Sequence, residues 1–472
     1  MRPGCVVVLD DGKTLSKLTI WSPDKQLIER RTHRNARAIS DGYPTLDVKG
    51  IGFWLTQTLA AFARLGDIAA IVPVAHGAAA CLIDDDGLCL PPLDYEAEPP
   101  SEVREQYLRL RDPFALTGSP SLPAGLNLGM QLFWLESSAP DKARRGRIVT
   151  WPQYWAWRLS GVAATEVTSL GCHTDLWIPA EGRPSPLAVA RGWAERLAPL
   201  RRAGDVLGPV TEEWRTRCNL PRDCMVLCGL HDSNAALLAT RGYPEVADRE
   251  CTILSTGTWF VAMRAVAPNT KIDPTSLPEA RDCLINVDVS GTPVPSSRFM
   301  GGREMELIAP EAASAIDPCA NKDILISIAG SMVKEGVFAL PTFQNGVGPF
   351  PMSAGRWIRQ PSDQLGRRAV AGLYLALMAN VSLDLIGSKE TLVIEGRFAD
   401  DPVFAGTLAA LRRQQGTYLS DANNSLPYGA LRLVNADLPP GAVLTRVEPL
   451  DYDLADYAAK WQSMVQTAEA AA

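Results

Sequence analysis

Short hydrophobic runs separated by polar turns dominate the N-terminal part of the chain. Apolar residues at positions 5–9 and 18–21 flank a polar stretch with a glycine, a pattern that predicts two antiparallel strands. A third short strand is expected at residues 26–29. The apolar spacing over residues 46–65 predicts an amphipathic helix, and residues 68–74 then predict another strand. The predicted order is three strands, a helix and a strand.

A related order begins again in the second half of the chain. Apolar residues 251–254 and 259–265 flank a turn of Ser, Thr and Gly, and residues 283–289 predict a further strand. Helical spacing follows over residues 367–386 and 402–415. The repetition of one plan predicts an α/β protein with two similar domains that face a cleft.

The boundary between these domains is expected near residue 245. Gly242 and Pro244 supply turn chemistry at this point. The prediction is therefore one domain at residues 1–245 and a second at residues 246–472.

The most apolar long segment, at residues 369–386, is interrupted by Asn380, Ser382 and Asp384. Three polar side chains in one stretch favour a helix buried in a protein core over a membrane span. We therefore expect no membrane association.

The composition and net charge indicate which kind of ligand the chain can bind. The chain of 472 residues, with 46% hydrophobic residues, is long enough for more than one hydrophobic core. Its formal net charge of -7 argues against a nucleic-acid surface, because phosphate neutralisation needs clustered Lys and Arg. We expect a small-molecule ligand and no nucleic acid.

The ten cysteines form no C-x-x-C pair, and the N-terminal apolar run ends in Asp10 without a signal-peptide cleavage pattern. This pattern predicts reduced thiols in a cytoplasmic protein. The spacing of Cys218, Cys224 and Cys228 suits no common zinc site, so no metal is assigned to them.

The first turn contains the groups that a phosphate site needs. Gly12 lets the backbone approach an anion, Thr14 can donate a hydrogen bond, and Lys13 or Lys17 adds positive charge. Asp10 can hold a hydrated Mg²⁺. A hairpin turn that merely carries polar side chains is an equal alternative on these residues alone.

The turn in the second half offers similar chemistry without a cation. The hydroxyls and amides of Thr256, Gly257 and Thr258 could bind the phosphates of a nucleotide. Ser, Thr and Gly occur in any hairpin turn, so this motif alone is weak.

Between the two turns, an apolar strand at residues 225–227 is followed by Gly229, His231 and Asp232 and then by a helical stretch rich in Ala and Leu. Asp232 is expected at the N-terminus of this helix, where the helix dipole stabilises its ionised form. The alternative is that it merely caps the helix. Its place between two phosphate-type turns favours a catalytic carboxylate.

Together these motifs resemble the FGGY carbohydrate kinases, especially the rhamnulokinases and fuculokinases. The resemblance rests on D-x-G-x-T-x-x-K at residues 10–17, G-x-H-D-S/T at residues 229–233 and S-x-G-T-W at residues 255–259. His76 and Gly77 look like the segment of the family that contacts the sugar. Weaker similarities extend over essentially the whole chain.

The resemblance implies two ribonuclease-H-like domains, of the type found in the actin and sugar-kinase superfamily, around a nucleotide cleft. It implies an ATP-dependent kinase of a small ketose, deoxyketose or polyol, with Mg²⁺, the sugar on the first domain and ATP on the second. Asp232 would be the general base. The implied sugar contacts are His76, Gly77, His231 and Asp232, the implied metal ligand is Asp10, and the implied nucleotide contacts are Gly12, Lys13, Thr14, Thr256, Gly257, Thr258 and Gly396.

Two departures from the family pattern leave questions open. Many members carry three glycines against the adenine, whereas only Gly396 is present here, so the nucleotide preference is open. The segment at residues 300–304 matches no family motif and is equally well explained as a turn that starts a helix.

Two other functions remain as alternatives. One is a non-catalytic, regulatory sugar- or nucleotide-binding protein of the same fold, and the other is a nucleotide-driven chaperone or filament protein. The identity of the sugar and the oligomeric state are open, with a homodimer as one option.

Overall fold

The computed structural model describes residues 2–40, 42–247, 249–267, 270–420 and 425–471. The chain forms two compact units. Unit 1 comprises Met1–Gly242, Ile285–Pro293 and Ser425–Pro440, and unit 2 comprises Tyr243–Leu284, Val294–Asn424 and Gly441–Ala472. The division expected near residue 245 does not include the two later segments that return to unit 1.

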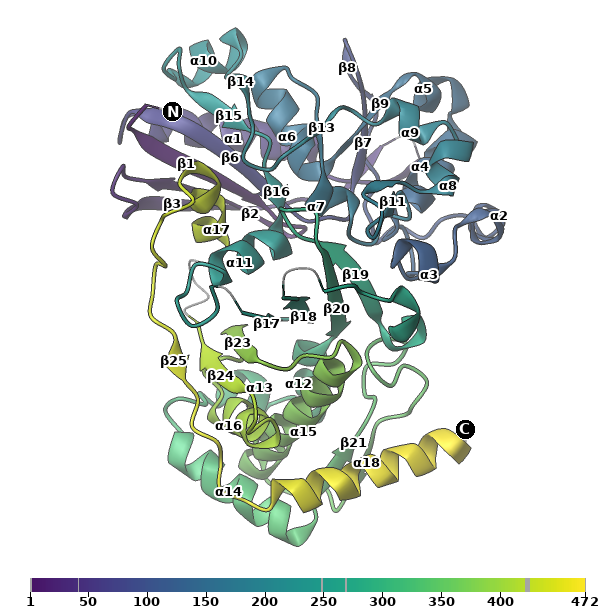
Figure 1. Ribbon diagram of the computed structural model, residues 1–472, viewed down its shortest axis with the longest axis vertical. Helices are drawn as coiled ribbons and strands as arrows, with labels where there is room; N and C mark the ends of the chain where they lie inside the picture. Colours follow the sequence, from purple (N-terminus) through teal and green to yellow (C-terminus); the bar gives the residue numbers. More distant parts are fainter. Residues whose placement is uncertain (1, 41, 248, 268–269, 421–424, 472) are drawn as a thin grey trace. The chain divides into compact units, whose positions relative to one another are not determined.

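Unit 1 is built on a mixed sheet (Figure 1). Its first strand pairs antiparallel with the second strand and parallel with the strand that follows the first helix, as expected from the sequence. Across the sheet the order is β14 (Val206–Pro209), β15 (Met225–Leu227), β6 (Ile68–Ala75), β1 (Cys5–Asp11), β2 (Leu15–Trp21) and β3 (Leu27–Arg34), and β16 (Leu230–His231) also pairs with β6.

Both faces of this sheet are buried. Val7 and Leu9 of β1 belong to one hydrophobic core, whereas Val6 and Val8 belong to another, because successive side chains of a strand point to opposite faces. The first core also contains residues of α1 (Val48–Phe62), α6 (Trp151–Ser160) and α10 (Glu212–Cys218). The second contains residues of α11 (Asp232–Thr240) and α17 (Ser425–Val434).

The return of α17 to unit 1 depends on a glycine. A Cβ atom at Gly429 would lie 1.8 Å from the carbonyl oxygen of Ala235, so only glycine lets α17 pack this closely on α11. This contact joins residues that are far apart in the sequence, which is why the linear pattern did not predict it.

A smaller sheet and a group of helices form a third core of unit 1. The sheet has the order β8 (Gly87–Leu90), β7 (Ala80–Asp84) and β9 (Arg147–Thr150). The helices of this core are α2 (Ser101–Leu110), α4 (Leu128–Ser138), α5 (Pro140–Arg145), α8 (Pro186–Ala190) and α9 (Trp193–Arg196). Unit 1 also has the short helices α3 (Phe114–Thr117) and α7 (Val167–Leu170) and the short strands β4 (Ala38–Ser40), β5 (Tyr43–Thr45), β10 (Thr165–Glu166), β11 (Trp177–Ile178), β12 (Arg183–Pro184) and β13 (Leu200–Arg201).

Unit 2 repeats the central plan of unit 1. Its first strand again pairs antiparallel with its hairpin partner and parallel with a later strand, so the predicted repeat is confirmed. In this unit the strands follow the order β20 (Pro293–Phe299), β18 (Phe260–Ala265), β17 (Cys251–Thr256), β23 (Thr391–Gly396), β24 (Gly416–Leu419) and β25 (Thr445–Arg446). Strand β19 (Cys283–Val287) precedes β20 in this order, and its residues from Ile285 onward are assigned to unit 1.

The helices of unit 2 include one that is long and apolar enough to cross a membrane. This helix, α15 (Gln364–Leu385), has 78% of its most apolar window buried, which confirms the expected buried helix. The remaining elements are α12 (Gly301–Ile308), α13 (Ala312–Ala315), α14 (Lys322–Glu335), α16 (Pro402–Leu411), α18 (Leu454–Ala471), the strands β21 (Phe338–Leu340) and β22 (Arg356–Ile358), and 3₁₀ turns at Pro274–Ser276 and Glu279–Arg281.

Two predicted boundaries differ from the structure. Strand β3 continues to Arg34, although only residues 26–29 were expected, because an exposed edge strand accommodates charged side chains that resemble a loop in sequence. Helix α16 ends at Leu411 rather than near residue 415.

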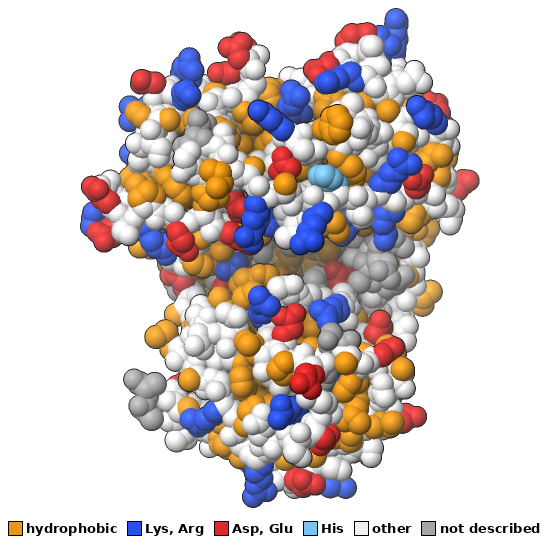
Figure 2. Space-filling view, turned by 180° about the vertical axis from the view of Figure 1, so that it is seen from behind, with side chains coloured by type: hydrophobic (Ala, Val, Ile, Leu, Met, Phe, Trp, Pro, Cys, Tyr) orange, Lys and Arg blue, Asp and Glu red, His pale blue; other side chains and the backbone are white. Residues whose placement is uncertain are grey.

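On the face drawn in Figure 2, Lys and Arg side chains are interspersed with Asp and Glu.

Candidate active site

Asp10 lies near the end of β1, where the hairpin of unit 1 turns. It is buried, and its Oδ2 atom lies 3.1 Å from the Nζ atom of Lys17, its register partner on β2. Burial raises the pKa of Asp10, and the positive charge of Lys17 acts in the opposite direction. A carboxylate held in this way is a suitable single protein ligand for Mg²⁺, which usually keeps several waters and binds substrate phosphates.

Asp11, which the sequence analysis did not single out, is fully buried beside the same turn. Its carboxylate accepts hydrogen bonds from the Ser16 hydroxyl at 2.5 Å and from Nε1 of Trp155 at 2.6 Å. Burial raises the pKa of Asp11 to about 7, although both hydrogen bonds oppose this shift. The neighbouring Asp10 in the motif was the only signal that could have indicated it.

The residues after Asp11 line a cavity of about 530 Å³, called the first cavity below. Gly12, Lys13, Thr14 and His76, all predicted site residues, are part of its lining. The Nζ atom of Lys13 forms an ion pair with Asp94 and lies 5.0 Å from the ring centroid of Tyr95. The structure thus brings four of the predicted residues together.

His76 directly follows β6 at the edge of the first cavity. Its Nδ1 atom accepts a hydrogen bond of 3.2 Å from the backbone N–H of Ala78, so the neutral ring carries its proton on Nε2. Burial, with Lys13 acting in the same direction, lowers the pKa of His76 to about 3. The ring is therefore a neutral hydrogen-bond donor at physiological pH.

Gly77 and Gly229 allow the backbone to pass close to its neighbours here. A Cβ atom at Gly77 would lie 2.7 Å from the Sγ atom of Cys172 and 3.0 Å from the ring of His231. Gly229 has φ +78°, and its Cβ atom would lie 2.0 Å from the carbonyl oxygen of Pro73. Only glycine fits at these positions, and His231 therefore packs against the His76 segment.

Asp232 is the first residue of α11, as predicted. Its Oδ1 atom accepts hydrogen bonds from the backbone N–H of Ser233 at 2.6 Å and from the Ser233 hydroxyl at 3.2 Å. Burial raises the pKa of Asp232 to about 6, whereas the bonds from Ser233 lower it. About a third of the side chain, 30%, stays exposed, which leaves room for a ligand.

His231 supports Asp232 from the preceding position. The Asn234 side-chain amide lies 3.3 Å from Nδ1 of His231, and Nε2 of His231 lies 3.2 Å from Oδ1 of Asp232. Since the amide nitrogen can only donate, the proton of the neutral ring is on Nε2 and faces the carboxylate. Burial lowers the pKa of His231 to about 4, so the ring is neutral at pH 7.

A buried carboxylate fixes the backbone before Asp232. Glu166 accepts hydrogen bonds from the backbone N–H and hydroxyl of Thr168, and the Thr168 hydroxyl accepts one of 3.0 Å from the backbone N–H of His231. Burial raises the pKa of Glu166 to about 7. This role of Glu166 depends on the contact between Thr168 and His231, which are far apart in the sequence.

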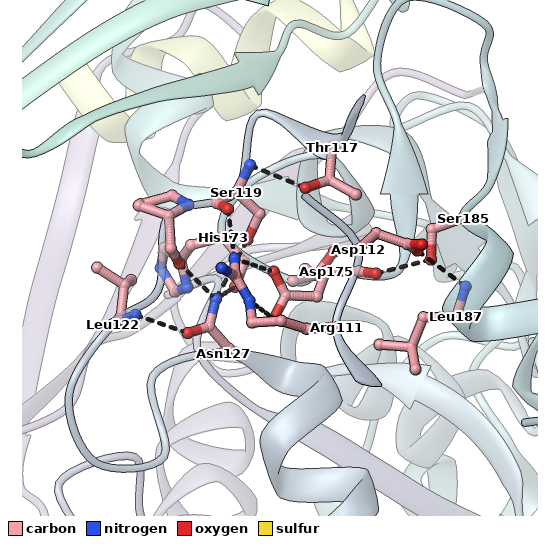
Figure 3. A network of polar contacts seen from close by, with 12 residues as sticks. Arg111, Asp112, Thr117, Ser119, Leu122, Asn127, His173, Asp175, Ser185 and Leu187 are labelled. Carbon is pink, nitrogen blue, oxygen red and sulfur yellow. Dashed lines mark hydrogen bonds and ion pairs between the residues drawn. The ribbon is translucent and has the colours of Figure 1, made fainter. Parts of the chain in front are cut away.

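Figure 3 shows a second polar network of unit 1 that the sequence analysis missed. Arg111 forms an ion pair of 3.0 Å with the buried carboxylate of Asp175. The Asn127 side-chain amide donates to the backbone oxygen of His173 at 3.1 Å, and Nδ1 of His173 lies 2.8 Å from the backbone oxygen of Leu126. This network fixes His173, whose charge in its protonated form would oppose protonation of His76.

In unit 2, the turn after β17 places the predicted nucleotide residues together. Thr258 is exposed and Gly257 is partly exposed. Thr256, in contrast, is buried: its hydroxyl donates to the backbone oxygen of Glu395 at 2.6 Å and accepts from the backbone N–H of Phe398 at 3.0 Å. The hydroxyl proton of Thr256 is therefore already used within unit 2.

Gly396 is the register partner of Thr256 on β23. It has φ +92°, and a Cβ atom there would lie 2.1 Å from the Thr256 carbonyl oxygen, which explains why glycine is needed.

The segment at residues 300–304, whose role the sequence left open, starts α12. A Cβ atom at Gly302 would lie 2.5 Å from the carbonyl oxygen of Gly257, so the start of this helix packs against the turn. Glu304 is buried and accepts hydrogen bonds from the backbone N–H groups of Phe343 and Gln344. The segment thus supports the turn, in agreement with the simpler explanation.

Comparisons with known proteins show which family this chain resembles. The sequence model described as "Carbohydrate kinase FGGY, C-terminal domain" matches residues 248–441. A curated rhamnulokinase from Ligilactobacillus salivarius (strain UCC118) is 28% identical over 161 residues, which are 34% of this chain and 30% of that protein. The match thus spans less than a third of the length of that relative.

Among solved structures, a carbohydrate kinase from Novosphingobium aromaticivorans is 46% identical, with a TM-score of 0.94 and coverage of 99% of this chain and 100% of that chain. A xylulose kinase from Rhodospirillum rubrum is 18% identical, with a TM-score of 0.76 and coverage of 99% and 98%, and thereby shows the fold alone. The expected α/β fold of the sugar kinases is confirmed. The whole-length similarity to the Novosphingobium structure and the family match show that the chain belongs to the FGGY carbohydrate kinases, a family of phosphotransferases that act on an alcohol group.

Proposed function

We propose that this protein transfers the γ-phosphoryl group of ATP to a hydroxyl of a small ketose, deoxyketose or polyol, with Asp232 as the general base. The observation that carries the proposal is the environment of Asp232. Its Oδ1 atom is held by Ser233 and His231, while the side chain stays partly exposed beside the His76 segment. A carboxylate that is fixed on one oxygen and accessible on the other suits proton transfer.

The raised pKa of Asp232 favours this role. A base with a pKa of about 6 is ionised at pH 7, yet it is a stronger proton acceptor than an ordinary carboxylate. It accepts the proton of the sugar hydroxyl as that oxygen attacks the phosphorus. The Nε2 atom of the neutral His231 lies 3.2 Å from the carboxylate and restricts its orientation.

His76 acts as a sugar contact in this proposal. No partner for its Nε2 atom is found in the part of the chain that the structure describes, although the atom is buried. A neutral ring with an unpaired N–H is suited to donate to a sugar oxygen. Tyr95, whose ring lies 5.4 Å from that of His76, is an additional candidate to contact the sugar.

The phosphate groups of ATP are assigned to the two hairpin turns. In unit 1, Gly12, Lys13 and Thr14 offer backbone amides, a positive charge and an exposed hydroxyl. In unit 2, Gly257 and Thr258 offer amides and a hydroxyl, with Gly396 beside them. Thr256 acts in this proposal by positioning the turn, since its hydroxyl is bonded to the Glu395 backbone.

Magnesium is assigned to Asp10. No group of three or more His, Cys, Asp and Glu side chains that could hold a metal ion occurs among the described residues. A single carboxylate nevertheless fits Mg²⁺, because this ion is commonly held by one or two carboxylates and by phosphate oxygens. When bound, Mg²⁺ neutralises charge on the transferring phosphoryl group.

All ten cysteines are free, which suits a reducing compartment, so the cytoplasm remains the predicted location. A homodimer remains one option for the oligomeric state, and the nucleotide preference stays open.

The experiment that tests the proposal is a coupled assay of ADP release over ketoses, deoxyketoses and polyols, with Mg²⁺ and ATP. We expect ADP release that depends on at least one of these acceptors. Binding of a sugar, measured by isothermal titration, without ADP release from any acceptor would instead support the non-catalytic alternative.

A further inference from the structure

Unit 1 contains another cavity, of about 460 Å³, whose lining comes from α1, α6, α10 and the strand β8. This aromatic cavity has a volume within the range of small-molecule sites. Its lining is rich in large rings, namely Phe53, Tyr154, Trp155, Trp157 and Trp214. Phe53 is 67% exposed, so the cavity opens to solvent on an apolar side chain instead of closing into the core.

The charges around the aromatic cavity have one sign. Lys49, Arg158 and Arg217 belong to its lining, and none of the described residues that line it is acidic. Arg217 is paired with Glu213 at 2.7 Å. Lys49 and Arg158 have no acidic partner within the described parts of the chain. Two cations are therefore available to an anion in this cavity.

A tyrosine hydroxyl also lacks a partner here. Tyr154 is only 2% exposed, yet no hydrogen-bond partner for its hydroxyl is found among the residues that the structure describes. Burial raises the pKa of Tyr154, so the hydroxyl stays protonated and can donate. Since Tyr154 belongs to the lining, its hydroxyl can donate to a ligand oxygen in the cavity.

Two of the three indole N–H groups in the lining, in contrast, are already bonded. Nε1 of Trp214 donates to the backbone oxygen of Arg158 at 2.6 Å, and Nε1 of Trp155 donates to Asp11 at 2.6 Å. Trp155 and Trp214 are almost fully buried, so the exposed Phe53 and the partly exposed Trp157 offer the apolar surface that suits a flat or ring-shaped body. Trp155 also connects this cavity with Asp11, which lines the first cavity.

The geometry points to a second ligand site in the aromatic cavity, for a phosphate monoester with a ring-shaped body. The ring packs against the aromatic side chains, and the phosphate oxygens accept from Arg158, Lys49 and the Tyr154 hydroxyl. A phosphorylated sugar and a nucleoside monophosphate share this chemistry. The site goes beyond the proposed transfer reaction and does not depend on it.

Phenyl phosphate is the probe that isolates this chemistry, because it is neither a sugar nor a nucleotide. Its binding to the full-length protein is measured by isothermal titration and by the fluorescence of the tryptophans around the cavity. We expect it to bind more tightly than phenol or inorganic phosphate. Arg158→Gln should weaken binding by about tenfold or more, and Tyr154→Phe by about tenfold or less.

Arg144→Gln is the matched control, since Arg144 lies on α5 and is exposed outside the cavity. It should leave the affinity for phenyl phosphate unchanged. Equal affinity of the wild-type protein and both cavity variants would overturn the site. So would binding of phenyl phosphate that is no tighter than that of inorganic phosphate.

Fructose 1-phosphate and AMP then distinguish the two sources of ligand. Either compound can also occupy the transfer site, so only binding that Arg158→Gln weakens is assigned to the aromatic cavity. We expect at least one of the two to lose about tenfold in affinity in this variant. If neither loses affinity, the assignment to a metabolite phosphate is wrong.

Discussion

The hairpin turns of the two units occupy the same place in the same strand order, yet their chemistry differs. The turn of unit 1 gathers charged groups: Asp10 and Asp11 are buried beside it, and Lys13 is paired with Asp94. The turn of unit 2 has no charged side chain at residues 255–259, and its Thr256 hydroxyl bonds to the backbone of Glu395. A repeated backbone plan thus fixes where a turn lies, while side chains decide what it can do.

The largest effect is expected for Asp232, because a general base is proposed in only one of the two units. Only unit 1 has a proposed base, so Asp232→Asn should lower sugar-dependent turnover by about 10²–10⁴. ATP binding should persist, because the proposed ATP contacts do not include Asp232. Steady-state kinetics and isothermal titration with ATP measure the two effects.

Asp85→Asn is the control, since Asp85 is an exposed acid of unit 1 outside the site. Turnover of Asp232→Asn close to that of Asp85→Asn would remove Asp232 from the proposed mechanism.

The next effect concerns the charged turn of unit 1. Asp10→Ala removes the proposed metal ligand and should raise the Mg²⁺ concentration needed for half-maximal turnover by about 10–100-fold. Titration of activity with Mg²⁺ at fixed ATP and sugar measures this shift. An unchanged Mg²⁺ requirement would mean that the buried Asp10–Lys17 pair is structural.

The pH dependence of the activity tests the role of Asp232 as the base of unit 1 without a mutation. Asp232 acts as a base only when ionised, and burial raises its pKa to about 6, although the hydrogen bonds from Ser233 and the charge of Lys17 act in the opposite direction. Activity should therefore be constant above this pKa and fall about tenfold for each pH unit below it. The plot of log kcat/KM against pH measures the limb, and a flat profile between pH 5 and 7 would contradict the assignment.

The smallest effects are expected for Thr256 and Thr258, the two threonines in the hairpin turn of unit 2. Thr256→Val removes the hydroxyl's bonds to the Glu395 oxygen and the Phe398 N–H, so it should lower the free energy of unfolding by about 1–3 kcal/mol. Thr258→Val, at an exposed position, should change it by less than about 0.5 kcal/mol and should instead raise the KM for ATP. Urea unfolding and ATP kinetics distinguish them, and the reverse pattern would exchange the two roles.

Local patterns explain what the sequence could predict. The hairpins, the helix that starts at Asp232 and the buried helix α15 follow from alternation, glycine turns and apolar spacing over short distances. The first cavity likewise contains four residues that the motifs indicated.

Contacts between distant residues account for most of what could not be predicted. Asp11 is bonded to Trp155, which is 144 positions away, and Lys13 pairs with Asp94. The same reason applies to Thr256: its residue type is typical of a phosphate turn, but its hydroxyl meets a backbone oxygen that lies 139 positions further along the chain.

The central claim is that the γ-phosphoryl group passes from ATP to a sugar hydroxyl. Phosphorus-31 NMR of the wild-type protein, incubated with Mg²⁺, ATP and the best acceptor from the ADP-release screen, follows both products directly. The account predicts ADP and a sugar phosphate in equal amounts, and neither product from Asp232→Asn on the same timescale. Formation of ADP with inorganic phosphate alone, or equal rates in the two proteins, would contradict it.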